Sequence, residues 1–330
     1  MVNKLKFNDR KFCVAPMMGY TTPYARNLYR ILSKRAFLFT EMIACKTMIY
    51  SKNRDLIIEN SEHNPVALQV GGSDLKDLKK CSEIAYQYNY DEINLNVGCP
   101  SKAVQKGSFG ACLMQDKVLV RQCLEAIQGG KINASIKCRI GLGKKLNYEF
   151  FEEFVDEILK SGIEIIYVHA RNAILNGISP SQNRSIPQLD YTFVKKIKSK
   201  YPNVIFILNG GIDNLEKAQH LVNDFDGVML GRLIQNNPFL LKNIDGLFYN
   251  LETSTVINED IIHNYFNFIR PKINSESIFR LLSPLLNIFF GVPNSKQFKV
   301  EIHESMKNNK LELIEGILLD FIKKNKMILN

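Results

Sequence analysis

The chain has 330 residues, of which 45% are hydrophobic, and its formal net charge at pH 7 is +10. This composition can bury a large core, and the absence of an apolar run near the roughly 20 residues of a membrane-spanning helix excludes that class. The excess of cations suits a polyanionic partner such as a nucleic acid, although a general enrichment in lysine would give the same balance.

Strand-like runs recur along the first part of the chain, with amphipathic segments between them. Strands are expected at residues 12–15, 36–40, 65–70, 92–97, 134–138, 163–170, 204–208 and 227–230. Helices are expected at 74–88, 116–128, 148–160, 191–200 and 215–222, several of them opening on an Asp, Asn or Ser cap. Strands and helices that alternate over about 240 residues are typical of a TIM barrel, with a doubly wound open sheet as the alternative.

Residues 94–101 read Asn-Leu-Asn-Val-Gly-Cys-Pro-Ser, so the fourth strand breaks into a turn that holds Cys99 at its end. Within the strand, Asn94 and Asn96 share one face and apolar residues share the other. Two amides before a thiol indicate a site, whereas the plainer interpretation is an ordinary cysteine in a tight turn.

The cysteines show no pattern typical of a disulfide framework or a metal site. There are seven of them, without any C-x-x-C spacing or Cys/His cluster, so neither zinc nor an iron–sulfur cluster is expected. Residues 1–6 lack the apolar core of a signal peptide. We therefore expect a cytoplasmic protein with free thiols.

Polar residues end five consecutive strands, in phase with positions that would point into a barrel. They are Gln69, Asn96, Lys137, His169 and Asn209. In a TIM barrel these strand ends form the catalytic face. Singly, His169 could be a core histidine and Lys137 could face solvent, but together they favour the barrel over the open sheet.

Glycines follow the last two strands. Asn209-Gly210-Gly211 comes after the seventh strand and Gly231-Arg232 after the eighth. A glycine pair alone indicates only a turn, but at this place in a barrel it offers backbone N–H groups and a fixed cation to a phosphate.

From residue 246 onward the sequence indicates helices only. They are expected at 260–270, 276–290, 295–306 and 311–324, which divides the chain into a barrel domain, 1–245, and a helical domain, 246–330. The charges of the helical domain nearly balance, so the excess cations lie in the barrel. Those that follow strand ends are Lys102, Lys106, Arg139, Lys144, Lys145, Arg171 and Arg184. Each alone is more simply a solvated loop charge.

Several of these segments together resemble the tRNA-dihydrouridine synthases. They are 14–18 (Val-Ala-Pro-Met-Met), 68–72 (Leu-Gln-Val-Gly-Gly), 94–101, 136–139 (Ile-Lys-Cys-Arg), 168–171 (Val-His-Ala-Arg), 209–211 and 231–232. The resemblance spans about residues 10 to 245. Segments 109–114 and 175–180, with Asn183, Arg184 and Ile186-Pro187, resemble the A-type bacterial branch, which modifies uridines 20 and 20a of the tRNA D-loop.

The resemblance implies a barrel that holds FMN, takes hydride from NADPH and saturates the C5–C6 bond of a uridine in tRNA. Carried over by position, the cofactor residues are Pro16, Met17 and Met18 along the flavin, Gln69, Lys137 and His169 at its ring or ribityl chain, and Asn209, Gly210, Gly211, Gly231 and Arg232 at its phosphate. Cys99 is implied as the proton donor and Asn96 as a neighbour of the uracil. A thiol with a pKa of about 8.5 is mostly protonated at neutral pH and can give a proton to a carbanion.

The expected contacts to tRNA are Asn96, Asn183 and Arg184 at the barrel and Lys296 and Lys299 in the helical domain. Residues 293–300 depart from the A-type pattern, which usually has a Pro-Gly-Ala-Arg stretch followed by a Trp and paired arginines. Two cations remain as Lys296 and Lys299, but the aromatic is smaller and one arginine is replaced by valine. Lysine also lacks bidentate phosphate geometry. No protein partner is indicated, and a monomer is expected. Two alternatives stay open: a flavin-dependent dehydrogenase of a free pyrimidine, of the dihydroorotate type, and a tRNA-binding protein without catalysis, in which Cys99 would be dispensable.

Overall fold

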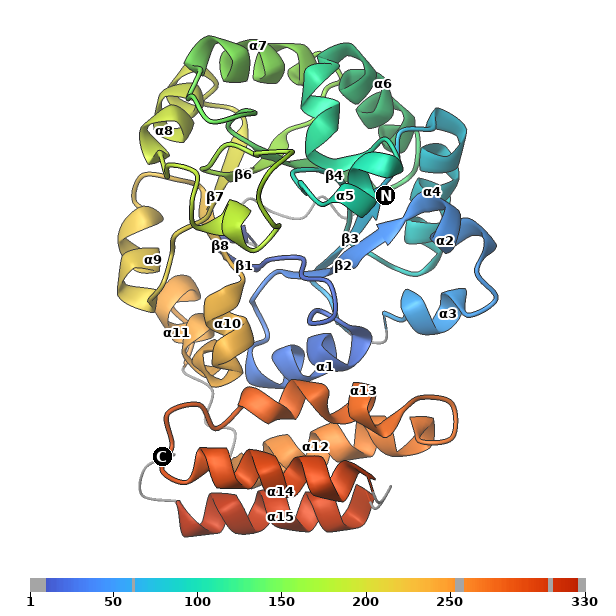
Figure 1. The fold of residues 1–330 in the computed structure, drawn as a ribbon, viewed down its shortest axis with the longest axis vertical. Helices are drawn as coiled ribbons and strands as arrows, with labels where there is room; N and C mark the ends of the chain where they lie inside the picture. Colours follow the sequence, from blue (N-terminus) through green and yellow to red (C-terminus); the bar gives the residue numbers. More distant parts are fainter. Residues whose placement is uncertain (1–9, 61–62, 253–257, 308–310, 326–330) are drawn as a thin grey trace.

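The computed structural model describes residues 10–60, 63–252, 258–307 and 311–325. Eight parallel strands form one sheet in the order β1-β8-β7-β6-β5-β4-β3-β2. Between β1 and β2 the ring is closed through Phe37, whose carbonyl accepts from the Val14 N–H at 2.8 Å and whose N–H donates to the Phe12 carbonyl at 2.9 Å. Helices surround this ring (Figure 1). The predicted TIM barrel is confirmed.

The strands lie close to their predicted places. They are β1 (Phe12–Val14), β2 (Leu38–Ala44), β3 (Val66–Gly71), β4 (Glu92–Val97), β5 (Asn133–Arg139), β6 (Ile165–His169), β7 (Ile205–Asn209) and β8 (Gly227–Leu230). The prediction for the second strand, 36–40, is wrong at both ends, because β2 begins at Leu38 and continues to Ala44. The pairing register shifts between Phe39 and Met42, so the strand continues past these residues.

The five predicted outer helices are present, each beginning at most one residue after its predicted start. They are α4 (Leu75–Gln87), α6 (Lys117–Gln128), α7 (Tyr148–Leu159), α8 (Tyr191–Lys200) and α9 (Leu215–Leu221). Helix α1 (Pro23–Leu32), which precedes them, is not among the predicted helices. The side chains of Asp74, Asp116 and Asn147 each accept from a backbone N–H of the first turn. Shorter elements lie in the connections: α2 (Cys45–Tyr50), α3 (Arg54–Ile57), α5 (Lys102–Lys106), α10 (Arg232–Asn236), α11 (Ile244–Tyr249), and the 3-10 helices η2 (Gly110–Gln115), η3 (Gln182–Arg184) and η4 (Pro238–Asn243).

The carboxy-terminal part is helical, as predicted. It contains α12 (Asn258–Ile269), α13 (Ile278–Leu282), α14 (Ser295–Lys307) and α15 (Leu311–Lys324), with the 3-10 helices η5 (Arg270–Lys272) and η6 (Ser283–Asn287). The single helix predicted at 276–290 is wrong. It ends at Leu282, because Pro284 has no N–H to donate and its ring disfavours a continuous α-helix. Nowhere in the described segments is a helix both long and apolar enough to cross a membrane.

The boundary drawn between residues 245 and 246 falls inside α11, which packs on the barrel. Asp245 accepts hydrogen bonds from the Ser33 hydroxyl and from the Lys34 and Arg35 N–H groups. Beyond it the helical part lies beside α1 at one side of the barrel (Figure 1), where the Tyr24 and Phe268 rings are 6.4 Å apart. The division into two domains stays a prediction.

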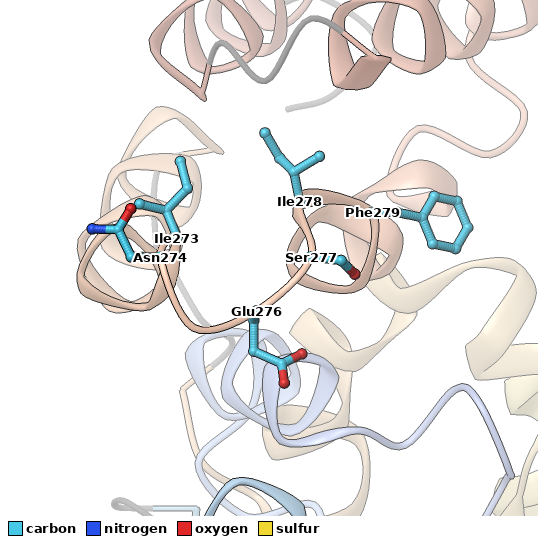
Figure 2. A pocket seen from close by; sticks show the side chains of 6 residues that line it. All are labelled: Ile273, Asn274, Glu276, Ser277, Ile278 and Phe279. Atoms are coloured by element: carbon cyan, nitrogen blue, oxygen red, sulfur yellow. The ribbon is translucent and has the colours of Figure 1, made fainter.

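A hollow of about 460 Å³ lies in the helical part (Figure 2). Its lining consists of Ile273, Asn274, Glu276, Ser277, Ile278 and Phe279. The side chains of Ile273 and Ile278 point to one side of the loop and Glu276 to the other. Because these residues lie in α13 and the loop before it, the hollow is separate from the strand ends.

Candidate active site

The Cys99 turn is held from several sides. The Asn96 side-chain oxygen accepts from the N–H groups of Gly98 and Cys99, at 3.2 and 3.0 Å. On the other side Gly110 lies so close that a Cβ on it would stand 2.6 Å from the Cys99 carbonyl oxygen. The thiol itself is partly exposed, and its Sγ lies 3.6 Å from Oγ of Ser101. The backbone of the turn is therefore fixed, whereas the cysteine itself stays partly accessible.

Arg139 lies beneath this turn and its guanidinium is almost fully buried. It donates to the carbonyl oxygens of Gly98 at 3.1 Å, Asn183 at 3.1 Å and Asn172 at 3.3 Å. Burial lowers the pKa of Arg139 to about 10. The sequence suggested a mouth cation here, whereas the structure makes Arg139 a link between two loops. The sequence contained a signal for this position, because Arg139 stands two residues after Lys137 and therefore lies on the same face of β5.

Lys137 projects from β5 toward β7, where its Nζ donates to the Asn209 side-chain oxygen at 3.0 Å. Burial, and then the positive charge of Arg139, lowers the pKa of Lys137 to about 8. The Asn209 amide nitrogen donates in turn to the Met229 carbonyl at 2.7 Å. Asn209 thus positions Lys137 and ties β7 to β8, which leaves its predicted phosphate contact without support from this geometry.

His169 ends β6 in a strongly positive environment. Burial, followed by the charges of the nearest arginines and lysine, lowers its pKa well below the usual range, so the imidazole is neutral at physiological pH. Its Nδ1 is buried and has no hydrogen-bond partner within the described segments. Gly210 lies against the ring, since a Cβ there would approach it to 3.1 Å. A neutral imidazole with an unused nitrogen is suited to a polar ligand.

The glycine loop after β7 has the backbone that only glycine adopts easily, with φ of +105° at Gly210 and +67° at Gly211. The Tyr191 hydroxyl donates to the Gly210 carbonyl and the Lys217 ammonium to the Gly211 carbonyl, both at 2.6 Å. Both carbonyls are therefore held by neighbouring side chains. Gly231 completes the cradle after β8, where a Cβ would stand 3.2 Å from the sulfur of Met17.

Cations gather here without carboxylates to neutralise them. The four charges that depress the His169 pKa belong to Arg139, Lys137, Arg171 and Arg232. In the part of the chain that the structure describes, none of the four forms an ion pair. Arg232 is exposed, with one nitrogen 3.3 Å from the Arg184 carbonyl oxygen. This arrangement fits an anionic group that is bound between β6 and β8.

The remaining predicted cofactor residues differ in their accessibility. Pro16 and Met17 are partly buried where β1 ends, whereas Met18 is 63% exposed. Gln69 is buried, and both ends of its amide are used by Asn94 and Asn96. Met18 and Gln69 as flavin contacts stay predictions.

The predicted tRNA residues separate into two groups. Asn183 is fully buried, and its amide bonds to the backbone of Ile174 and Ser179. A direct RNA contact for Asn183 therefore has no support from this geometry and stays a prediction, because the side chain shapes the loop that carries Arg184. The side chains of Arg184 and Lys296 are exposed. Lys299 is partly buried, and its Nζ donates to the Asn287 side-chain oxygen at 2.8 Å.

The fold and this site define a TIM-barrel protein whose mouth is suited to bind an anionic group beside a thiol. Solved structures of the old yellow enzyme homologue from Zymomonas mobilis (TM-score 0.53, 11% identity, 77% of this chain and 92% of that one) and of morphinone reductase (TM-score 0.51, 10% identity, 76% and 90%) share the fold. The family model of dihydrouridine synthases (Dus) matches residues 13–323.

Curated relatives carry the same identification further. A tRNA-dihydrouridine(20/20a) synthase of Pasteurella multocida is 39% identical over 306 residues, covering 92% of this chain and 93% of that protein. The synthase of the same name from Vibrio cholerae is 38% identical over 298 residues, covering 89% and 91%. The chain belongs to the dihydrouridine synthase family and is a flavin-dependent oxidoreductase. This membership removes the free-pyrimidine dehydrogenase and the non-catalytic protein as alternatives.

Proposed function

We propose that this protein reduces uridines 20 and 20a in the D-loop of tRNA to 5,6-dihydrouridine, with FMN as its flavin and NADPH as reductant. The observation that carries the proposal is the fixed Cys99 turn beside a cluster of cations at one barrel mouth, none of which forms an ion pair with another described residue. The positions follow the names of the relatives, which modify 20 and 20a.

The residues of the mouth fit a phosphate-bearing flavin, which when bound and reduced supplies a hydride. Gly210, Gly211 and Arg232 would hold the phosphate end through backbone N–H groups and a guanidinium. His169 and Lys137 would face the more central part of the cofactor, where the unused imidazole nitrogen can bond to it. These roles agree with the positions that the sequence predicts.

The chemistry that remains for the chain is the delivery of one proton. Reduction at C6 of uracil leaves negative charge at C5 and the adjoining carbonyl, and the Cys99 Sγ–H is the group placed to neutralise it. Asn96 accepts from the N–H groups of the turn and Arg139 donates to its carbonyl, so the thiol is already oriented before the base binds. Lys137, largely protonated at neutral pH, contributes positive charge beside the developing anion.

Recognition of the tRNA falls to exposed cations around the mouth and on the helical part. Arg184 and Lys296 are exposed, and the partly buried Lys299 of α14 donates to Asn287 of η6. Because a stacked base cannot enter a barrel, the uridine has to leave its stack while phosphates are held elsewhere. We place the protein in the cytoplasm as a monomer, in keeping with its free cysteines.

Mapping of dihydrouridine by mass spectrometry tests the substrate. The tRNA from cells that lack this protein should carry uridine at 20 and 20a, and expression of the protein should restore dihydrouridine there. Unchanged modification at both positions would refute the assignment of site.

A further inference from the structure

A continuous chain of buried side chains runs from the floor of the barrel to the Cys99 turn. Asn96 donates to Gln69 at 2.8 Å, and Gln69 donates to Asn94 at 2.7 Å. Asn94 donates to the Ser135 hydroxyl at 2.7 Å, and Ser135 donates to the Glu92 carboxylate. None of these side chains is more than 8% exposed. Glu92 begins β4 and Asn96 is four residues further, so the chain spans about 13 Å of the barrel interior.

The groups at the two ends of the chain require the same donor-to-acceptor direction of its hydrogen bonds. At the floor, the Glu92 carboxylate pairs with Arg10 at 2.6 Å and can only accept hydrogen bonds, so the Ser135 hydroxyl has to donate to it. At the mouth, the N–H groups of Gly98 and Cys99 can only donate, so Asn96 has to present its oxygen to them. Each amide between these ends has one orientation that satisfies both neighbours.

We propose that Glu92 and Ser135 are positioning residues for Cys99, because they set the orientation of the amide chain that holds its turn. The inference rests on the proposed role of Cys99 as proton donor. Loss of the Ser135 hydroxyl leaves the buried Asn94 amide nitrogen without its acceptor. The orientation of Asn94, Gln69 and Asn96 is then set only by the N–H groups at the mouth, so the amide chain holds the Cys99 turn less firmly.

The ion pair at the floor is consistent with this role. A buried ion pair adds little stability over a well-packed apolar pair, because desolvation of both charges offsets their attraction. An apolar residue in place of Glu92 would fill the floor but would leave the chain without its acceptor. The carboxylate therefore has a use that packing does not supply.

The experiment measures how fast tRNA reoxidises the flavin in NADPH-reduced enzyme, for Ser135→Ala, Asn96→Ala and the double variant. Ser135→Ala should slow this step roughly tenfold or more, since small misplacements of a reacting group are costly. If Ser135 acts through Asn96, the double variant should be no slower than Asn96→Ala alone. Alkylation of the Cys99 thiol by iodoacetamide, read by peptide mass spectrometry, should change by the same factor in Ser135→Ala and Asn96→Ala.

Tyr167→Phe is the matched control. The Tyr167 hydroxyl lies 3.3 Å from the other Glu92 oxygen, outside the chain, so its loss should lower thermal stability without slowing reoxidation. The inference would be overturned if the double variant were slowed by the product of the two single factors. It would also be overturned if Tyr167→Phe slowed reoxidation as much as Ser135→Ala, or if Ser135→Ala kept the native rate. Cys99→Ala in the same assay separates the two claims, because a native rate there refutes the proton-donor role itself.

Discussion

The guanidinium of Arg139 donates to the carbonyl oxygen of Gly98 at 3.1 Å, which joins the turn that carries Cys99 to the loops that follow β6. The other carbonyls that Arg139 bonds belong to Asn172 and Asn183, on either side of the loop before η3. A buried cation thus fixes one wall of the mouth against the thiol. Its neighbours accept through backbone atoms, so the side chain alone determines whether the link exists.

Arg139→Lys should destabilise the protein and slow uridine reduction. Lysine presents one compact ammonium, which cannot reach three carbonyl oxygens at once. Hydrogen bonds to charged groups contribute about 1.5–3 kcal/mol each, so the free energy of unfolding should fall by at least that amount. Denaturant unfolding and dihydrouridine formation measure the two effects, with the exposed Lys144→Ala as control. A lysine variant as stable and as active as the parent would contradict the link.

Cys99→Ala should separate the two halves of the reaction. Flavin reduction by NADPH should continue near its normal rate, whereas dihydrouridine formation should fall about 100- to 10,000-fold, the usual contribution of a general acid. Cys112→Ala is the matched control, because that thiol is also partly exposed but bonds to the Phe109 carbonyl. Its loss should affect stability at most. Native dihydrouridine formation by Cys99→Ala would remove the thiol from the mechanism.

The barrel was predictable because each of its signals is local. Alternation along β4 placed Asn94 and Asn96 on the inner face, and polar strand ends marked the mouth. The break at Pro284 was predictable as well, because a proline inside a helical pattern is a local signal for its end, but the apolar spacing in 276–290 continues across it and outweighed that signal. The continuation of β2 escapes prediction because the shift in register depends on its pairing with β3.

The site was predicted in its residues more fully than in their roles. Asn183 is buried and Asn209 holds Lys137, because their hydrogen-bond partners come from a loop and a strand that sequence patterns do not bring together. For Arg139 the alternation along β5 gives its face, which it shares with Lys137, but not its three acceptors, which are backbone carbonyls. Sequence patterns locate a side chain on a face, whereas its partners depend on packing between elements.

The pKa of Lys137 predicts how stability depends on pH. In the folded protein the pKa is lowered from 10.5 to about 8, so the unfolded chain binds more protons between these values. Stability should therefore rise with pH from about 8 to 10.5 through this group. Lys137→Met should remove that part of the rise in flavin-free protein, as measured by denaturant unfolding across a pH series. An identical pH dependence in both proteins would show that the lysine titrates normally.

Arg232→Ala should weaken retention of the flavin. The exposed guanidinium lies next to the glycine cradle, where a charge-assisted bond to phosphate contributes about 1.5–3 kcal/mol. Arg232→Lys keeps the charge without bidentate geometry, so its flavin affinity should lie between those of the parent protein and Arg232→Ala. Flavin titration into the stripped protein gives the affinities, and Lys144→Ala controls for loss of a mouth charge. Equal affinities for Arg232→Ala and the parent would place the phosphate elsewhere.

Binding of tRNA should fall steeply with salt, because phosphate contacts release counterions. Lys296 is exposed on α14, and Lys299 on the same helix bonds to Asn287, whose amide nitrogen donates to the Gln235 carbonyl on α10 at 3.1 Å. Since α10 begins at Arg232, this face of α14 is linked to the barrel mouth. The double variant Lys296→Ala/Lys299→Ala should bind tRNA more weakly, and the log–log salt slope should become shallower by about 0.7–0.9 for each phosphate that the variant no longer binds.

The matched control for this variant is Lys323→Ala/Lys324→Ala, which removes the same charge from the exposed end of α15. If the α14 lysines bind phosphates, the control should keep the salt slope of the parent protein. Arg184→Ala at the mouth, added to the α14 variant, should make the salt slope of that variant shallower still. Equal changes in both double variants would mean that only net charge matters. An unchanged slope and affinity in the α14 variant would show that these two lysines bind no phosphates, because a protein that binds two fewer phosphates must release fewer counterions. The helical part would then bind tRNA through other residues, or the barrel mouth alone would hold it.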